Sequence, residues 1–183
     1  MRLFVSVSLD ELVGEVADIQ EPFVGVDGLR TTNPEQAHLT LKFLGETEET
    51  RLRALTDGVD AAIADTGIEP FEVSFGGLGV FPHLNYIRVI WLGVRNGSET
   101  VRRLHTAIEK RVTKFGFEPA NSNFTPHVTL ARMDHAGNKE LVKDEVRQSD
   151  PDGGTMTVEA IQLTKSTLTE QGPEYTAIER FNL

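Results

Sequence analysis

The sequence predicts an α+β fold of two similar lobes related by a pseudo-two-fold axis, and three observations support this prediction. Segments that alternate apolar and polar residues, as strands do, are interleaved with segments of helical periodicity. Several expected strands follow each other directly, which favours antiparallel or mixed pairing over a purely parallel sheet. The tetrad His–apolar–Thr–apolar occurs twice, as HLTL at 38–41 and HVTL at 127–130. We therefore expect an antiparallel or mixed sheet with helices packed outside in each lobe, and an active-site cleft between the lobes.

The first half of the chain is expected to alternate between strands and helices. A strand covers residues 2–8, and a helix with acidic residues in its first turn covers residues 9–21. Residues 37–44 alternate with a period of two and form the next strand, which Gly45 ends. Residues 47–64 carry apolar side chains at helical spacing and are expected to form the second helix.

The second half begins with two expected strands, 70–80 and 85–94, joined by FPHL as the turn. An amphipathic helix opens at Gly97 and Ser98 and ends at Gly116. The remaining expected elements are a strand at 124–132, a helix at 137–148, and strands at 155–168 and 174–183. No linker is long enough to divide this series, so residues 1–183 are expected to form a single bilobal domain.

Composition and charge restrict the possible functions. The formal net charge of −10, from 28 Asp+Glu and 18 Lys+Arg, argues against a broad basic surface for duplex nucleic acid. Cysteine is absent, which excludes thiol chemistry and thiolate metal sites. The first apolar run is too short for a signal peptide or a membrane span, so we expect a cytoplasmic protein without membrane contact. The acidity fits a salt-rich cytoplasm and an ordinary acidic enzyme equally well.

The repeated tetrad places one imidazole and one hydroxyl on the same face of each strand. Residues i and i+2 of a strand point to the same side, so His38 and Thr40 project together while the apolar members project oppositely. The same holds for His127 and Thr129. If both lobes face one cleft, the two His and the two Thr converge there.

Two imidazoles suit a reaction that needs both a general base and a general acid. An ordinary His pKa of about 6.5 allows one neutral and one protonated ring near neutral pH. Hydroxyls and a protonated ring donate hydrogen bonds to an anion with several oxygens, and a phosphodiester is such an anion. Hydrolysis of a strained cyclic phosphate needs this base and this acid, and it needs no metal.

Two other interpretations of the tetrads are open. A lone HLTL is most often structural, but its duplication at matching strand positions favours a function. A metal site with two His ligands is the more specific alternative to the acid–base pair, although the two strands lack the Asp or Glu that would complete it. We therefore expect no metal and no cofactor.

The sequence resembles the two-histidine (2H) phosphoesterases, and within them the bacterial and archaeal RNA 2′,3′-cyclic phosphodiesterases, also called 2′-5′ RNA ligases. AHLTLKFLGE and FTPHVTLAR carry the two signatures. VFPHLNYIRVIWLGV is similar to the family's middle segment, and LTKSTLTEQGPEYTAIERFNL is similar to its C-terminal hairpin. The match covers essentially the whole chain. It implies a two-lobed α+β fold and hydrolysis of a 2′,3′-cyclic phosphate at an RNA end to leave a 2′-phosphate.

The resemblance also implies roles for individual residues. His38 would be the proton donor to the departing 3′ oxygen and His127 the proton acceptor that activates water, although the sequence alone leaves these two roles interchangeable. Thr40 and Thr129 would hold the nonbridging phosphate oxygens. Arg132 closes the second signature and is expected to bind substrate, but strict alternation turns it away from the cleft unless the strand ends or bulges near position 131.

Further residues near the signatures are weaker candidates. Lys42 is in phase with the first His and Thr, so we expect it to bind phosphate at the cleft rim, although a solvated strand-end Lys is equally compatible. Phe43 and Phe81 are candidates for stacking on a base, with a core role as the alternative. His105, on the long helix, is expected to be exposed.

The expected partners are RNA ends or oligonucleotides that bear a 2′,3′-cyclic phosphate, and no obligate protein partner is evident. Because the chain is acidic, recognition should centre on the terminal nucleotide. Reversible 2′-5′ RNA ligation would use the same site. The alternative is an RNA- or nucleotide-binding module of the same fold without turnover, which the presence of both His and both Thr disfavours. The sequence leaves open the oligomeric state and the choice among tRNA halves, other RNA ends, 2′-5′ oligonucleotides and small cyclic phosphates.

Overall fold

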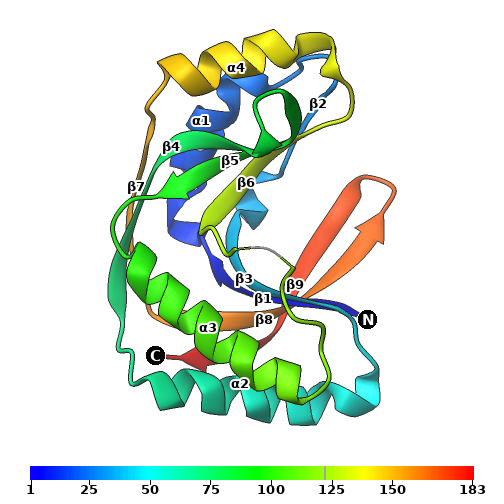
Figure 1. Cartoon of the computed structure of the whole chain (residues 1–183), viewed down its shortest axis with the longest axis vertical. Coiled ribbons are helices and arrows are strands. Elements are labelled where there is room, and N and C mark those ends of the chain that lie inside the picture. Colours follow the sequence, from blue (N-terminus) through cyan, green and yellow to red (C-terminus); the bar gives the residue numbers. More distant parts are fainter. Residues whose placement is uncertain (122) are drawn as a thin grey trace.

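The strands assemble into one curled sheet in which the observed strand pairs are antiparallel. The computed structural model describes residues 1–121 and 123–183 (Figure 1). In chain order the elements are β1 (Arg2–Ser8), α1 (Val13–Gln20), β2 (Leu29–Thr31), β3 (His38–Glu46), α2 (Leu52–Thr66), β4 (Phe71–His83), β5 (Tyr86–Val94), α3 (Ser98–Lys114), β6 (His127–Met133), α4 (Lys139–Gln148), β7 (Asp152–Val158), β8 (Ala160–Thr169) and β9 (Gly172–Asn182). The strands lie side by side in the order β7-β4-β5-β6-β3-β1-β8-β9, and β2 pairs with β6.

The sheet consists of two halves that meet at a short seam. We call β7, β4, β5, β6 and β2 the β6 half, and β3, β1, β8 and β9 the β3 half. β6 is paired with β5 at five positions and β3 with β1 at seven. Between β3 and β6 the one pairing is Leu39 opposite Val128. The predicted α+β fold is therefore confirmed, with the refinement that a single sheet runs through both lobes.

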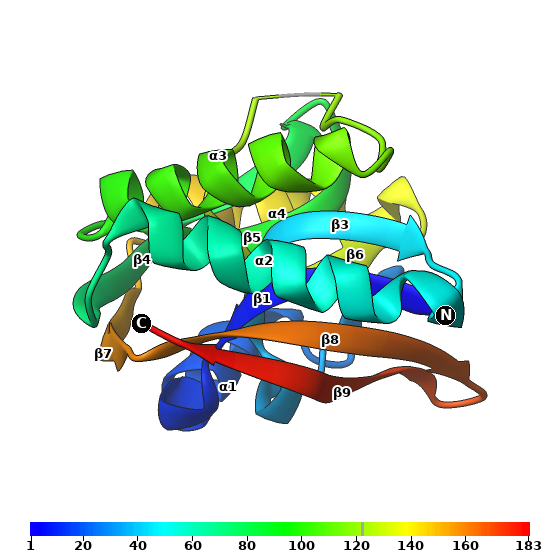
Figure 2. The same ribbon diagram turned by 90° about the horizontal axis from the view of Figure 1, so that it is seen from below.

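Helices cover the outside of each half, and two of them cross from one half to the other. α2 and α3 run side by side along the β3 half (Figure 2), whereas α1 and α4 lie along the β6 half (Figure 1). α3 follows β5 of the β6 half in the chain but packs on β3. α1 follows β1 of the β3 half but contacts β6 and β7. The two lobes are thus tied together by helices as well as by the seam.

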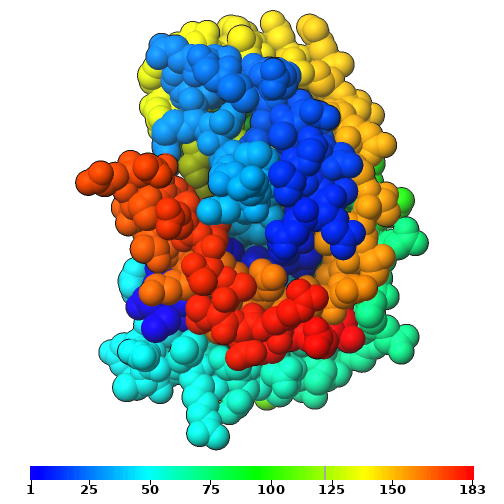
Figure 3. All heavy atoms as spheres, turned by 180° about the vertical axis from the view of Figure 1, so that it is seen from behind, coloured from blue at the N-terminus to red at the C-terminus, as the bar shows by residue number. Residues whose placement is uncertain are grey.

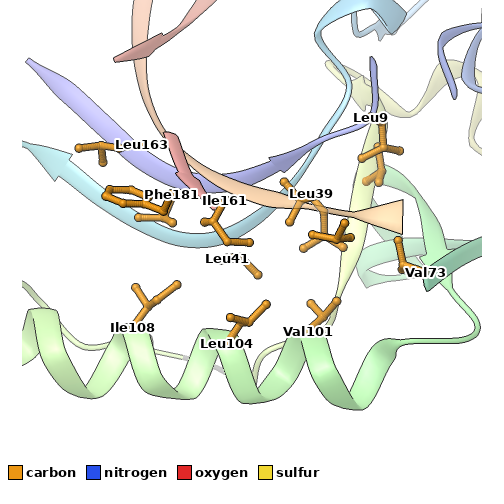
Figure 4. Close-up of a cluster of buried hydrophobic side chains, with 14 of the residues drawn as sticks. Leu9, Leu39, Leu41, Val73, Val101, Leu104, Ile108, Ile161, Leu163 and Phe181 are labelled. Carbon is orange, nitrogen blue, oxygen red and sulfur yellow. The ribbon is translucent and has the colours of Figure 1, made fainter. Parts of the chain in front are cut away.

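The apolar members of both tetrads are core residues. Leu39 and Leu41 are each 1% exposed and point toward the apolar face of α3 (Figure 4). Val128 and Leu130 are fully buried in the same core. Burial of a large aliphatic side chain stabilises the fold by about 1.5–3 kcal/mol, and a slip of one residue would expose the whole set. The core therefore determines which face of each strand carries the His and the Thr.

Several expected elements differ from the structure. β2 was not expected, β3 runs past Gly45 to Glu46, and β6 begins at His127 and not at residue 124. Two further differences have a structural reason. FPHL is not the turn, because Phe81, Pro82 and His83 still pair with β5. β7 pairs only with Phe71–Gly76, so the C-terminal end of β4 has no second neighbour among the observed pairs. Such an edge position tolerates the missing N–H of proline. The strand expected at 155–168 is broken at Glu159, where the chain passes from β7 beside β4 to β8 beside β1.

None of the helices in the described ranges is both long enough and apolar enough to cross a membrane.

Candidate active site

The two tetrads meet at the seam and present their polar members on one face. Leu39 and Val128 are directly opposite each other and point into the core. The same antiparallel register, continued by one residue, sets His38 opposite Thr129. It sets His127 opposite Thr40. Opposite residues of antiparallel strands share a face, so the two imidazoles and the two hydroxyls project together, away from the core.

This polar quartet is compact. Cβ atoms of directly opposite residues lie roughly 4.5–5.5 Å apart, which places each imidazole beside the hydroxyl of the other strand. All four side chains are half-buried. The space-filling view shows the surface hollowed beside the β8–β9 hairpin, between that hairpin and the N-terminal segments (Figure 3). The convergence expected for His38, Thr40, His127 and Thr129 is thus present.

Both imidazoles are held by equivalent hydrogen bonds. Nδ1 of His38 is 2.9 Å from the carbonyl oxygen of Gln36, and Nδ1 of His127 is 2.7 Å from that of Thr125. A carbonyl oxygen can only accept, so Nδ1 carries the proton and donates it in both rings. Nε2 is consequently the free nitrogen, a proton acceptor in the neutral ring and a donor in the imidazolium.

Aromatic rings surround each imidazole. Tyr175 of β9 lies edge-on to His38 at a centroid distance of 4.9 Å, and Phe4 of β1 lies 4.8 Å from the same ring. Phe81 of β4 lies edge-on to His127 at 4.8 Å. These contacts restrict the tilt of the imidazoles and exclude water from their edges. Phe81 is therefore placed against a catalytic candidate, whereas no sequence motif pointed to Tyr175.

A bulge at the same place in both strands changes the face of the residues that follow. The β6 register shifts after Thr129, and both Leu130 and Ala131 are buried. The strand therefore brings Arg132 back to the face of the quartet. The expectation for Arg132 depended on a bulge near position 131, and that bulge is present. Arg132 is exposed and forms no ion pair within the described residues.

The corresponding bulge in β3 corrects the expectation for Lys42. The register of β1 with β3 shifts between Thr40 and Lys42, so Lys42 points to the core side and is only 5% exposed. Its ammonium nitrogen lies 2.8 Å from Oε2 of Glu109 on α3. Lys42 therefore does not reach the rim of the site. Phe43 takes the corresponding place on the quartet face and is 65% exposed, which leaves its ring available for stacking.

Side chains from two helices hold the bulges in place. The carbonyl oxygen of Leu41 lies 2.7 Å from Nδ1 of His105 on α3, and that of Leu130 accepts a 2.9 Å bond from the amide of Gln20 on α1. The Leu130 carbonyl also accepts from the backbone N–H of Thr32 at 2.9 Å, next to the β2–β6 pairing. His105 was expected to be exposed, but it is partly buried with its ring stacked on Phe124. No sequence pattern singled out Gln20.

Burial and positive charge both disfavour the imidazolium form at this site. Burial lowers the pKa of His38 and of His127 below the ordinary value of 6.5, and the hydrogen bond to each backbone carbonyl offsets part of this effect. The guanidinium of Arg132 lowers both pKa values further, and His127 lowers that of His38. These effects favour two neutral rings in the protein alone, and a bound anion would raise their affinity for a proton.

The groups on this face of the sheet suit an anion with several oxygens. They are two imidazoles, two hydroxyls and one guanidinium, and neither Thr40 nor Thr129 engages its hydroxyl in a hydrogen bond within residues 1–121 and 123–183. In the same ranges no three His, Asp or Glu side chains are grouped as a metal site would require. The chemistry available from these side chains is proton transfer and hydrogen bonding.

Known proteins resemble this chain over its whole length. Residues 9–170 match the family model of the 2′-5′ RNA ligase superfamily. The RNA 2′,3′-cyclic phosphodiesterase of Methanothermobacter thermautotrophicus is 37% identical, with 100% of this chain and 99% of that protein aligned. The protein of the same name from Methanocaldococcus jannaschii is 33% identical, with 99% and 100% aligned.

Solved structures share the fold. The crystal structure of TT0787 of Thermus thermophilus superposes with a TM-score of 0.81 at 28% identity, covering 100% of this chain and 98% of that one. The crystal structure of E. coli LigT complexed with 3′-AMP gives a TM-score of 0.80 at 24% identity, with the same coverage.

The two imidazoles of the free protein are expected to titrate below pH 6.5, because burial and Arg132 disfavour the imidazolium. Arg132→Gln removes the positive charge, so the pKa of both rings should rise toward 6.5. NMR titration of the ring Hε1 signals of His38 and His127 measures both values. If neither pKa moves in the variant, Arg132 does not face the quartet.

Proposed function

The chain belongs to the 2′-5′ RNA ligase superfamily, and within it we propose that the protein is a metal-independent RNA 2′,3′-cyclic phosphodiesterase. It hydrolyses the cyclic phosphate at an RNA end and leaves a 2′-phosphate. The observation that carries this proposal is the convergence of His38, Thr40, His127 and Thr129 on one face at the seam. The names of the relatives from two archaea support the same activity.

The reaction is an in-line displacement at phosphorus with a proton transfer at each end. Nε2 of His127 accepts a proton from water as the water oxygen bonds to phosphorus. The bond from phosphorus to O3′ breaks as Nε2 of His38 donates a proton to that oxygen. The products are a 3′-hydroxyl and a 2′-phosphate, and the two rings regain their starting protonation through solvent.

The polar neighbours stabilise the charge that develops on phosphate. Thr40 and Thr129 lie beside opposite imidazoles, so their hydroxyls donate to the two nonbridging oxygens. Donors placed where negative charge grows in the transition state contribute strongly to catalysis in a site shielded from water. Arg132 supplies a full positive charge on the same face. We infer that Arg132 contributes to binding the phosphate anion.

The bound anion also changes the protonation of the site. Arg132 lowers the pKa of both imidazoles in the protein alone. A phosphodiester carries one negative charge, which compensates the guanidinium and raises the pKa of the adjacent rings. Substrate binding thus favours a mixed state in which one ring is protonated and the other is neutral. The assignment of donor and acceptor follows the family resemblance, because the two rings have equivalent Nδ1 bonds.

The same site supports 2′-5′ RNA ligation when a 5′-hydroxyl replaces water. Attack of that hydroxyl on the cyclic phosphate opens the ring at O3′ and yields a 2′-5′ phosphodiester. This ligation needs the same base and the same acid. The ratio of ligation to hydrolysis in the cell depends on the relative access of RNA hydroxyls and water to the site.

The direct test offers a short RNA with a 2′,3′-cyclic phosphate end to the protein in excess EDTA. Turnover is expected to persist, and the product is expected to keep its phosphate on the 2′ oxygen, as ³¹P NMR or product chromatography can determine. Loss of turnover with the chelator, or a 3′-phosphate as the product, would contradict the mechanism. Tight binding without turnover would favour the binding-module alternative.

His38→Ala and His127→Ala are each expected to lower kcat by about 10²-fold or more, the scale on which a general acid or base contributes. His83→Ala is the matched control, because His83 is an exposed residue at the end of β4. Its turnover should stay at the wild-type level. A variant at position 38 or 127 that retains full kcat would remove that residue from the proton transfers.

The pH profile of kcat/KM is expected to be a bell centred below pH 6.5. The rate falls on the acid side when the base becomes protonated and on the alkaline side when the acid loses its proton. Both limbs report the free enzyme, in which both pKa values are lowered. A profile that stays flat between pH 5 and 9, or a bell centred above pH 7, is incompatible with this pair.

A further inference from the structure

The position of His127 relative to His38 is not determined by the sheet alone. β3 and β6 share the single pairing of Leu39 with Val128, and His127 is the first residue of its strand. Catalysis by a pair of groups requires their separation to be held closely, since a misplacement of about 1 Å can cost roughly 10²-fold in rate. Other contacts must therefore hold the segment that leads into β6.

A buried ion pair joins β3 to α3 beside the seam. Lys42 is 5% exposed and Glu109 has 19% of its side chain exposed, and the two charged groups lie 2.8 Å apart. Burial raises the pKa of Glu109, but hydrogen bonding and the charge of Lys42, together with the Ala120 amide, lower it below its ordinary value. Glu109 is consequently ionised at neutral pH, and the pair is a true ion pair.

Both members of the pair also bind the chain segment that precedes β6. The ammonium of Lys42 donates to the carbonyl oxygen of Glu118 at 2.6 Å. Oε1 of Glu109 accepts from the amide of Ala120 at 2.7 Å. The ion pair thus ties the strand of the first His to the segment that delivers the second.

The connection continues toward the second imidazole. His105, one helical turn before Glu109 on α3, stacks on Phe124 with ring centroids 3.9 Å apart and planes 9° apart. The next residue, Thr125, accepts the hydrogen bond from Nδ1 of His127. Phe124 and Thr125, which lead directly into β6, are thus in contact with α3 on one side and with the His127 ring on the other.

We propose that Lys42 and Glu109 are positioning residues for catalysis, whose ion pair sets the place of the His127 ring relative to His38. A buried ion pair is weak evidence of stabilisation, because an apolar pair of similar volume often serves stability as well. The Lys42–Glu109 pair contributes here through the direction of its hydrogen bonds, which hold the backbone at Glu118 and Ala120. The catalytic part of this inference rests on the proposed function, whereas the placement of the ring does not.

The test uses the double variant Lys42→Met/Glu109→Gln. It removes both charges together, so no unpaired charge is left in the interior, and it keeps the approximate volume of each side chain. The matched control is Asp65→Asn/Arg111→Gln. It removes an ion pair of 2.7 Å that also involves α3 but joins it to α2. Thermal unfolding of both variants shows whether each is folded. If the double variant is not, Lys42→Met alone serves, because it removes the ion pair and leaves only the more exposed of the two charges.

The expected result separates positioning from general stability. In the double variant, kcat on a short cyclic-phosphate RNA should fall by ~10-fold or more while KM changes little, since the phosphate contacts remain. The ring signals of His127 should shift in the NMR spectrum and its pKa should change. The signals of His38 should stay in place, because the pairing of β3 with β1 is untouched. The control variant should keep the wild-type kcat and both sets of signals.

Two outcomes would overturn the proposal. One is a folded double variant, or a folded Lys42→Met variant, with unchanged kcat and unchanged His127 signals. The other is an equal disturbance of both His rings, which would indicate general loosening of the sheet. If the wild-type protein shows no phosphodiesterase activity, the proposed function fails, but the NMR comparison still decides whether the ion pair positions His127.

Discussion

The chemistry of this protein depends on one pair of opposed residues, Leu39 and Val128, at which two antiparallel strands touch. Their burial turns the neighbouring His and Thr of both strands to the other face. The antiparallel direction then sets each imidazole beside the hydroxyl of the opposite strand. A four-residue pattern used twice becomes a site only because the core holds these two residues opposite each other.

The two halves of the site have the same framework and differ in what they present. Each strand bulges at the last residue of its tetrad, and each bulge carbonyl is bound by a helix side chain, His105 in one half and Gln20 in the other. After the bulge, one half exposes Phe43 and the other exposes Arg132. The matching bulges and strand pairings account for the matching Nδ1 hydrogen bonds of the two imidazoles. The residues after the bulges differ, so the β3 half offers an apolar ring and the β6 half a positive charge.

The alternation of apolar and polar residues was enough to predict most of the strands, their buried faces and the convergence of the two His and two Thr. It did not indicate the short strand β2, and it merged β7 and β8. It failed for Lys42, because a bulge is a tertiary feature that reverses the faces without leaving a mark in the periodicity. The same feature brings Arg132 into the site, which the family signature indicated and strict alternation opposed. The contributions of Tyr175, Gln20 and His105 come from segments far away in the chain, so no local pattern could identify them.

A crystal structure of the protein with a bound nucleoside 2′-phosphate tests the central claim most directly. The account predicts that Nε2 of His38 and Nε2 of His127 each lie about 3 Å from a different oxygen of the reaction centre, on opposite sides of the phosphorus atom. It would be contradicted by a phosphate that contacts only one of the two rings, or by a nucleotide bound outside the site at the seam.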